Sequence, residues 1–182
     1  MKVTPTAVPD VLLLEPPVHR DTRGFFLESW HATRYAGAGI GLPFVQDNHS
    51  RSVCGTLRGL HYQVVRPQGK LVTVVNGEIF DVAVDLRRSS PTFGRWAGVV
   101  LSDENQRQLW VPPGFAHGFY VTSESADVIY KCTDYYAPEH DRTLRWDDAD
   151  VGILWPLVGG RRPLLSPKDA AGPGFRDAPN YP

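Results

Sequence analysis

Three basic side chains stand close together in this sequence: Arg58, His61 and Lys70. The residues between them, within 55–63 and 68–70, are mostly small or apolar. Arg58 and Lys70 carry positive charge and can hold an anion or a developing oxyanion. His61 has an unperturbed pKa that lets it act as a base near neutral pH. The combination favours a site that removes a proton from carbon and stabilises the charge that results.

A single histidine in a strand is more often structural than catalytic, and a nearby arginine and lysine usually belong to a solvated face. A second histidine, His117, follows Pro113 and Gly114 in a glycine-containing turn. Taken alone, His117 is interpreted equally well as a hydrogen-bonded histidine of that turn. The two histidines and the motifs around them together favour a functional site.

Short apolar runs separated by turn residues make up most of the chain, which is typical of an all-β sandwich or barrel. Asn76 and Gly77 lie between two such runs and predict a two-residue hairpin. The clear early helix is expected over 31–38, ended by Gly37 and Gly39. Strands are expected over 11–14, 25–30, 44–50, 70–75, 78–86, 96–101, 108–111, 117–122 and 127–136.

Three smaller features complete the expected architecture. Residues 19–24 are expected to form a turn before the strand 25–30. In the strand 44–50, Gln46, Asn48 and Ser50 alternate and would share one face. From position 155 onward proline and glycine become frequent, which indicates an irregular C-terminal tail wrapped on the barrel.

Composition excludes several function classes. The formal net charge is −1 and the pI about 6.6, so no overall basic field favours nucleic acid or a membrane surface. Two cysteines, Cys54 and Cys132, without a CxxC motif, fit a reducing compartment. No apolar run approaches membrane length. We therefore expect a single cytoplasmic domain over 1–182 with no membrane or nucleic-acid partner.

Residues 55–61 and 112–117 resemble the two sequence motifs of the cupin superfamily, whose fold is a small jelly-roll barrel. Metal-binding cupins have two histidines and a glutamate in the first motif, where this chain has His61, Gln63 and Gln68. Amides are weak ligands for divalent metals. We therefore expect a cupin-type jelly-roll barrel with short peripheral helices, without a metal, in which His61 is free to act as a base.

Longer stretches of the chain resemble the dTDP-4-dehydrorhamnose 3,5-epimerase family. The resemblance runs from about residue 8 to residue 178 in the family's order, and it is specific because several unrelated strings agree. The stretches are 58–63, 68–72, 81–87, 90–94, 101–102, 114–119, 130–131 and 165–169. The resemblance implies a single cupin-like epimerase domain.

The family inverts C3 and C5 of a dTDP-4-keto-6-deoxy sugar through enolate intermediates, giving dTDP-4-keto-L-rhamnose for deoxysugar biosynthesis. The resemblance implies that His61 is the base and that Asp169 is its carboxylate partner. Tyr130 matches the family's acid, on the opposite face of the sugar, and Lys70 would stabilise the enolate oxygen. Taken without the resemblance, Tyr130 is an ordinary core tyrosine. No cofactor is implied.

Further residues match family positions that bind substrate. Gln46, Asn48 and Ser50 would contact the substrate from their shared face. The complete set implied by the resemblance is Arg23, Phe26, Glu28, Gln46, Asn48, Ser50, Arg58, His117, Tyr136 and Lys168. Those at 23–28 help to bind the nucleotide across a subunit interface in the family, which implies a homodimer. Asp141 departs from the glutamate of many members.

Four alternatives to the double epimerase stay open. The chain could invert C3 or C5 alone, as single-carbon epimerases of antibiotic-sugar pathways do, or act as a related ketoisomerase. It could also be a non-catalytic barrel that binds nucleotide sugars, or a metal-dependent cupin. Incorporation of solvent deuterium into the substrate separates enzyme from binder, and a metal assay separates the metal cupin.

Overall fold

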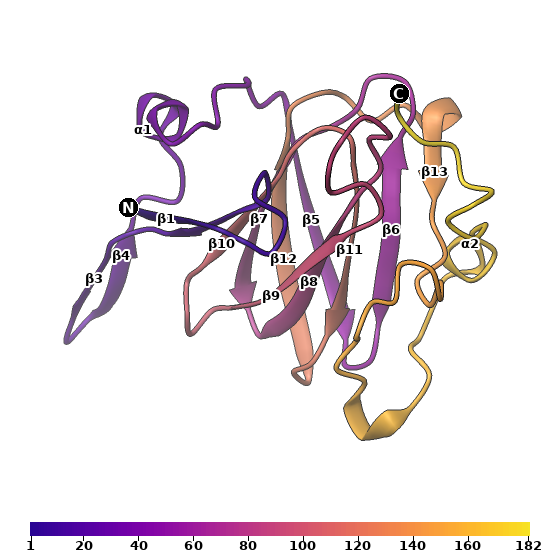
Figure 1. Ribbon diagram of the computed structural model, residues 1–182. Helices are drawn as coiled ribbons and strands as arrows, with labels where there is room; N and C mark the ends of the chain where they lie inside the picture. Colours follow the sequence, from indigo (N-terminus) through magenta and orange to yellow (C-terminus); the bar gives the residue numbers. More distant parts are fainter.

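Two antiparallel sheets face each other in a computed structural model that describes all 182 residues (Figure 1). The six-stranded sheet has the order β1 (Lys2–Pro5), β2 (Leu12–Glu15), β10 (Gln108–Val111), β7 (Lys70–Asn76), β12 (Ser125–Cys132) and β5 (Gln46–Val53). The five-stranded sheet has the order β13 (Asp141–Thr143), β6 (Leu57–Gln63), β11 (Phe115–Val121), β8 (Glu78–Asp85) and β9 (Trp96–Ser102). The predicted all-β class is confirmed.

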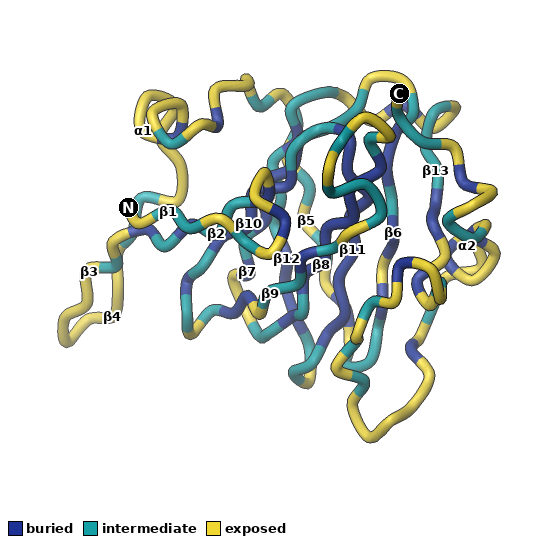
Figure 2. Tube along the Cα trace, in the orientation of Figure 1, coloured by how far each residue is buried: buried dark blue, intermediate teal, exposed yellow.

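The main core lies between these sheets, where alternating side chains of both inner faces meet. Its members come from both sheets, for example Val72 and Val128 from one and Ala83 and Phe119 from the other. The buried segments are concentrated in the central strands (Figure 2). This shared core holds the two sheets together and fixes the side chains that project between them.

Asn76 and Gly77 do form a tight turn, but the predicted hairpin is wrong. The turn joins β7 to β8, and these strands belong to different sheets. β7 pairs with β10 and β12, whereas β8 pairs with β11 and β9. Gly77 has φ +76°, and a Cβ there would lie 2.0 Å from the carbonyl oxygen of Ser125. The turn therefore carries the chain from one sheet to the other, as a jelly roll requires.

A separate hairpin formed by β3 (Val18–Asp21) and β4 (Gly24–Leu27) projects away from both sheets (Figure 1). The turn predicted over 19–24 is shorter than expected, since residues 18–21 already form a strand. The strand predicted over 25–30 ends at Leu27. The predicted early helix is confirmed as α1 (Ala32–Gly37).

The tail covers the outer face of the five-stranded sheet. Val151 and Ala178 pack on Leu60, Val82 and neighbouring apolar residues of that face. The tail contains a short 3-10 helix, η2 (Val158–Gly160), and the helix α2 (Pro167–Ala170). Another short 3-10 helix, η1 (Pro138–His140), precedes the tail. The predicted irregular tail wrapped on the barrel is confirmed.

Two tyrosine hydroxyls fasten the end of the tail to β6. Tyr62 donates a hydrogen bond to the carbonyl of Pro179 at 2.6 Å, and Tyr181 donates to the carbonyl of Gln63 at 2.5 Å. Burial of these rings raises the pKa of Tyr62 to about 12 and also raises that of Tyr181. Both hydroxyls therefore stay protonated and remain donors at neutral pH.

The helices of the fold are all too short or too polar to cross a membrane.

Candidate active site

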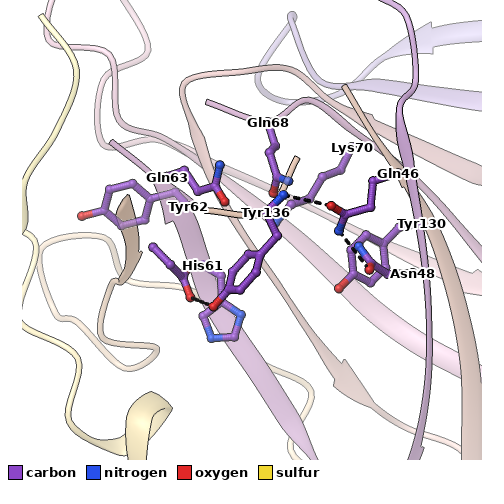
Figure 3. A pocket seen from close by; sticks show the side chains of 10 residues that line it. Gln46, Asn48, His61, Tyr62, Gln63, Gln68, Lys70, Tyr130 and Tyr136 are labelled. Atoms are coloured by element: carbon purple, nitrogen blue, oxygen red, sulfur yellow. Dashed lines mark hydrogen bonds between the residues drawn. The ribbon is translucent and has the colours of Figure 1, made fainter. Parts of the chain in front are cut away.

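A cavity opens between the two sheets and has two chambers that share His61, Lys70 and Tyr130. The Tyr136 chamber, of about 280 Å³, is lined by Gln46, Asn48, His61, Tyr62, Gln63, Gln68, Lys70, Tyr130, Tyr136 and Asp141 (Figure 3). The His117 chamber, of about 140 Å³, is lined by Ser50, Arg58, His61, Lys70, His117, Phe119 and Tyr130. The prediction that His61, Lys70, His117 and Tyr130 point into the barrel interior is confirmed.

His61 reaches this cavity from β6 and forms a short bond with a carboxylate of the distant tail. Its Nε2 lies 2.5 Å from Oδ1 of Asp169, which belongs to α2. The predicted pairing of His61 with Asp169 is therefore present. The other ring nitrogen, Nδ1, makes no hydrogen bond within the protein, and the imidazole is 33% exposed toward the cavity. Nδ1 is thus the atom that can exchange a proton with a bound molecule.

Asp169 is held by the start of its own helix. Ser166 donates its hydroxyl to Oδ2 of Asp169 at 2.8 Å and accepts the backbone N–H of Asp169 at 3.1 Å. Burial acts to raise the pKa of Asp169, but the hydrogen bonds from His61 and Ser166 outweigh it and the net pKa is lowered. The carboxylate is therefore ionised at neutral pH and can stabilise a protonated His61.

Lys70 lies at the start of β7, on the opposite sheet from His61. Its side chain is buried, and its Nζ makes no hydrogen bond or ion pair within the protein. Burial lowers the pKa of Lys70, and the nearby Cys132 and Asp141 only partly oppose this effect. A buried ammonium without a partner is costly, and an anionic group bound in the cavity beside Lys70 would offset that cost.

Tyr130 projects from β12 beside Lys70, whose Nζ lies 6.0 Å from the centre of the Tyr130 ring. Burial raises the pKa of Tyr130, so its hydroxyl keeps its proton at neutral pH. That hydroxyl makes no hydrogen bond within the protein. Tyr130 and Lys70 come from the six-stranded sheet and His61 from the five-stranded sheet. An imidazole and a protonated phenol thus stand on opposite walls of one cavity.

The polar face predicted on β5 is confirmed. Gln46 and Asn48 line the Tyr136 chamber, and Ser50 lines the His117 chamber. Gln46 donates its Nε2 to Oδ1 of Asn48 at 3.1 Å and accepts the backbone N–H of Tyr136 at 2.9 Å (Figure 3). Arg58 donates its Nε to Ser52 at 2.8 Å, which fixes the guanidinium beside the His117 chamber.

Tyr136 and Lys168 meet at Asp141. The Tyr136 hydroxyl donates to Oδ2 of Asp141 at 3.0 Å, and the Lys168 ammonium forms an ion pair with the same oxygen. Tyr136 and Asp141 line the cavity, whereas Lys168 reaches its edge through this contact. Because Lys168 precedes Asp169 in α2, the ion pair also connects that helix to the cavity wall.

Three predicted binding residues lie away from the cavity: Arg23, Phe26 and Glu28. Arg23 pairs with Asp21 at 2.5 Å, and Glu28 pairs with Arg34. Arg23 and Phe26 line a separate hollow of about 350 Å³ on the β3–β4 hairpin. Phe26 is 71% exposed there. Within one chain, these residues therefore form no part of the wall of the cavity that contains His61.

The side chains at the cupin metal positions are occupied by other bonds. Gln63 donates to the carbonyl of Arg66 at 2.8 Å and accepts the N–H of Ala137 at 2.8 Å. Gln68 donates to the carbonyl of Asp134 at 2.8 Å. The Nε2 atoms of both histidines point at carboxylates instead of at a shared centre. This donor set does not fit a cupin metal ion, and metal independence stays a prediction that metal analysis of the purified protein tests.

The structure adds a residue that the sequence interpretation missed. Asp81 on β8 is fully buried, and its Oδ1 lies 2.7 Å from Nε2 of His117. The sequence signal for Asp81 was a carboxylate flanked on both sides by apolar residues of β8. An Asp side chain is rarely buried unless it is paired. His117 is therefore paired in the same way as His61. Tyr62 and Phe119 also line the cavity without having been predicted there.

Comparisons with known proteins agree with this geometry. The sequence profile described as dTDP-4-dehydrorhamnose 3,5-epimerase matches residues 5–177. A protein of that name from Pseudomonas aeruginosa is 57% identical over 183 residues, which cover 100% of each chain. A solved epimerase from Legionella pneumophila, in complex with dTDP-4-keto-L-rhamnose, gives a TM-score of 0.93 at 54% identity and covers 97% of this chain and 93% of its own.

A 3'-monoepimerase from Streptomyces bikiniensis, in complex with dTDP-quinovose, is also similar. Its TM-score is 0.87 at 34% identity, over 94% of this chain and 87% of that one. The solved neighbours confirm the predicted cupin-type jelly roll. With a profile that spans nearly the whole chain and relatives above half identity over full length, the chain belongs to the dTDP-4-dehydrorhamnose 3,5-epimerase family.

Proposed function

We propose that this protein inverts C3 and C5 of dTDP-4-keto-6-deoxy-glucose and releases dTDP-4-keto-L-rhamnose. The observation that carries the proposal is the placement of a carboxylate-paired histidine and a protonated tyrosine on opposite walls of one cavity. Inversion at carbon needs a base on one face and a proton donor on the other. The buried ammonium of Lys70 beside them supplies charge where an enolate oxygen develops.

Each inversion begins with removal of the proton on the carbon next to the ketone. Nδ1 of His61 accepts that proton, and the resulting imidazolium is stabilised through Nε2 by the Asp169 carboxylate. The electron pair of the C–H bond moves into the enolate, whose oxygen is held by Lys70. Tyr130 then donates its hydroxyl proton to the opposite face of the same carbon, which re-forms the ketone with inverted configuration.

Substrate recognition is assigned to the polar rim of the cavity. Gln46, Asn48 and Ser50 offer hydrogen bonds along one wall, and Arg58 offers a guanidinium suited to phosphate oxygens. Tyr136 presents a half-exposed ring at the mouth, where a pyrimidine base can stack. Lys168 carries a further positive charge at this edge.

Arg23, Phe26 and Glu28 are assigned to a nucleotide site completed by a second copy of the chain. Support comes from the β3–β4 hairpin, which projects from the barrel and is mostly exposed (Figure 2). Its two phenylalanines, Phe25 and Phe26, are 54% and 71% exposed. Exposed aromatic residues on a projecting element are typical of an interface. The proposed assembly is a homodimer in which each hairpin reaches its partner's cavity.

The cytoplasmic location stays a prediction from the sequence.

Solvent-hydrogen exchange tests the proposed function directly. The protein is incubated with dTDP-4-keto-6-deoxy-glucose in D₂O, and the sugar is analysed by NMR for deuterium and configuration at C3 and C5. We expect inverted configuration at both carbons, with deuterium at least at the carbon that is inverted first. Binding without deuterium at either carbon would contradict the proposal and favour a non-catalytic nucleotide-sugar barrel.

A single-carbon epimerase is the second candidate. It is favoured by the similarity to the 3'-monoepimerase from Streptomyces bikiniensis, since the two chains share the fold over nearly their full length. The same measurement separates the candidates because a single-carbon enzyme leaves one of the two carbons in its original configuration. The identity to that protein is 34%, against 57% to the Pseudomonas aeruginosa 3,5-epimerase, and we therefore place double inversion first.

A further inference from the structure

The cavity contains a second histidine–carboxylate pair that the proposed reaction does not use. His117 on β11 directs Nε2 to Oδ1 of Asp81 at 2.7 Å, and its Nδ1 makes no hydrogen bond within the protein. His61 is built in the same way, with Nε2 on Asp169 and Nδ1 free. The two histidines are direct partners in the β11–β6 register. Two imidazoles of matching construction therefore stand side by side on one wall.

Asp81 is more than an ordinary packing partner. It is fully buried, and its Oδ2 has no hydrogen-bond partner within the protein. A buried carboxylate with one oxygen unsatisfied is costly, and a purely structural contact gains nothing from that arrangement. The same carboxylate stabilises an imidazolium whenever His117 accepts a proton. The pair is thus suited to holding a proton for a short time.

Double inversion creates a need for such a group. After the first inversion His61 carries an additional proton and Tyr130 lacks one. The second inversion requires a neutral His61 and a protonated Tyr130 again, while the same sugar stays in the cavity. The reset therefore amounts to a net transfer of one proton from the wall of His61 to the wall of Tyr130.

We propose that His117 relays this proton between the two inversions, an inference that depends on the proposed function. Nδ1 of His117 accepts the proton from Nδ1 of His61, and Asp81 stabilises the imidazolium that forms. The same Nδ1 then donates the proton to the Tyr130 phenolate. No net charge or electron is gained or lost, and both catalytic groups return to their starting state.

The other groups that face the His117 chamber do not fit this task. Arg58 does not release its proton in proteins. Lys70 is assigned to the enolate oxygen and must keep its charge through both inversions. Ser50 and Phe119 do not titrate in the relevant range. His117 is the remaining residue of this chamber whose side chain can both accept and donate a proton near neutral pH.

The test uses His117→Gln, which can still donate a hydrogen bond to Asp81 but cannot pass a proton. A single turnover with enzyme in excess over dTDP-4-keto-6-deoxy-glucose is followed in D₂O by rapid quench and NMR. We expect the two inversions to slow unequally, because a lost substrate contact slows both of them whereas a lost relay slows only the second. The second inversion should slow by about 10²–10⁴-fold, the usual effect of losing a general acid–base group, so that singly inverted sugar accumulates.

Asp81→Asn is the second variant, because it keeps the imidazole and removes the charge that stabilises its protonated form. It should also slow the second inversion selectively, by less than His117→Gln. Thermal unfolding of each variant monitors the fold. Equal slowing of both inversions would assign His117 to substrate binding and overturn the relay, and so would a second inversion at the parent rate.

Failure of the relay is distinguishable from failure of the proposed function by the parent protein itself. A parent that inverts neither carbon contradicts the epimerase. A parent that inverts one carbon remains an epimerase but needs no reset between steps, which overturns the relay alone. A parent that inverts both carbons while His117→Gln accumulates the singly inverted sugar supports both.

Discussion

The hydroxyl of Tyr130 is chemically separable from its ring. Tyr130→Phe keeps the ring against Lys70 and removes only the proton donor. We expect the variant to retain exchange of substrate hydrogen for deuterium, since His61 can return a proton to the face from which it came. Formation of inverted product should fall by about 10²–10⁴-fold. Deuterium content compared with configuration measures the two effects, and inversion at the parent rate would show that Tyr130 is a core residue.

Two matched variants complete that prediction. His61→Ala should abolish exchange and inversion together, because the cavity then lacks the base. Asp169→Asn keeps the imidazole but removes its charge support, so both rates should lie between those of the parent and His61→Ala. An Asp169→Asn variant as active as the parent would contradict the assigned pair.

The pH profile of the reaction distinguishes Lys70 from Tyr130. Burial lowers the pKa of Lys70 from its usual 10.5 and raises that of Tyr130 above its usual 10.0. We expect the ammonium to be lost first as the pH rises, so that the rate falls on the alkaline side while Tyr130 still holds its proton. Lys70→Arg keeps its charge in this range, so its alkaline limb should move to higher pH even if its maximum rate is lower.

The thermal midpoint measured at each pH serves as the control for this profile. Because the pKa of Lys70 is lower in the folded protein, the unfolded chain binds more protons between that value and 10.5. The contribution of Lys70 to stability therefore rises with pH across this window. A rate that falls there results from loss of the charge of Lys70 and not from its effect on folding. An alkaline limb that stays in place in Lys70→Arg would contradict the assignment.

At the scale of the element, α2 is a helix of one turn, and its N-terminal capping residue, Ser166, positions Asp169. Ser166→Ala removes the hydroxyl that bonds both the carboxylate and the backbone N–H of Asp169. A lost cap of this kind costs about 1 kcal/mol. The resulting misplacement of Asp169 should lower kcat by about fivefold, the rate equivalent of that energy.

KM should stay unchanged in Ser166→Ala, because Ser166 does not line the cavity. Ser166→Thr keeps a hydroxyl and should restore most of the rate. Steady-state kinetics of the two variants give the comparison. A Ser166→Ala enzyme with the parent kcat would show that His61 alone is enough to hold Asp169.

The sequence pattern predicted most strands, because alternation reports which residues face the core. It could not predict which strands pair. Asn76 and Gly77 fit a hairpin turn locally, yet the shared core assigns β7 and β8 to different sheets. The short strand β13 lacked an apolar run of its own and is defined by its pairing with β6.

The candidate site was predictable where motifs are local and unpredictable where partners are distant. His61 and Lys70 could be identified from their neighbours in sequence. Nothing in the spacing indicates that Asp169, 108 residues further on, would reach His61, and that pairing was expected only from family resemblance. Asp81 was missed because its role depends on the contact with His117 across two strands.

At the scale of the whole molecule, the projecting β3–β4 hairpin divides the proposed site between two copies of the chain. Arg23 and Phe26 lie on the hairpin, whereas His61 lies in the barrel. A subunit with a damaged hairpin can therefore still contribute an intact base. A subunit without His61 can still contribute an intact hairpin. A mixed dimer of the two would contain one complete site.

This division predicts complementation. The two variants are Arg23→Ala/Phe26→Ala and His61→Ala, each of which is weakly active or inactive alone. When they are co-expressed in equal amounts, the mixture should regain about a quarter of the parent activity. This value follows because half of random dimers are mixed, and each mixed dimer has one complete site of two. Activity is measured on the tag-purified mixture. The matched control, His61→Ala with Tyr130→Phe, damages the same barrel and should show no gain. A fully active monomer in sedimentation would contradict the dimer.

The distance in sequence between His61 and Asp169 also has a consequence for protein synthesis. A ribosome completes β6 and most of the barrel strands long before it adds α2. A nascent chain thus has its base, its lysine and its tyrosine while the carboxylate does not yet exist. Until translation has passed Asp169 and the tail has packed on β6, the base lacks its charge support, and the growing polypeptide turns over the sugar nucleotide more slowly than a finished molecule.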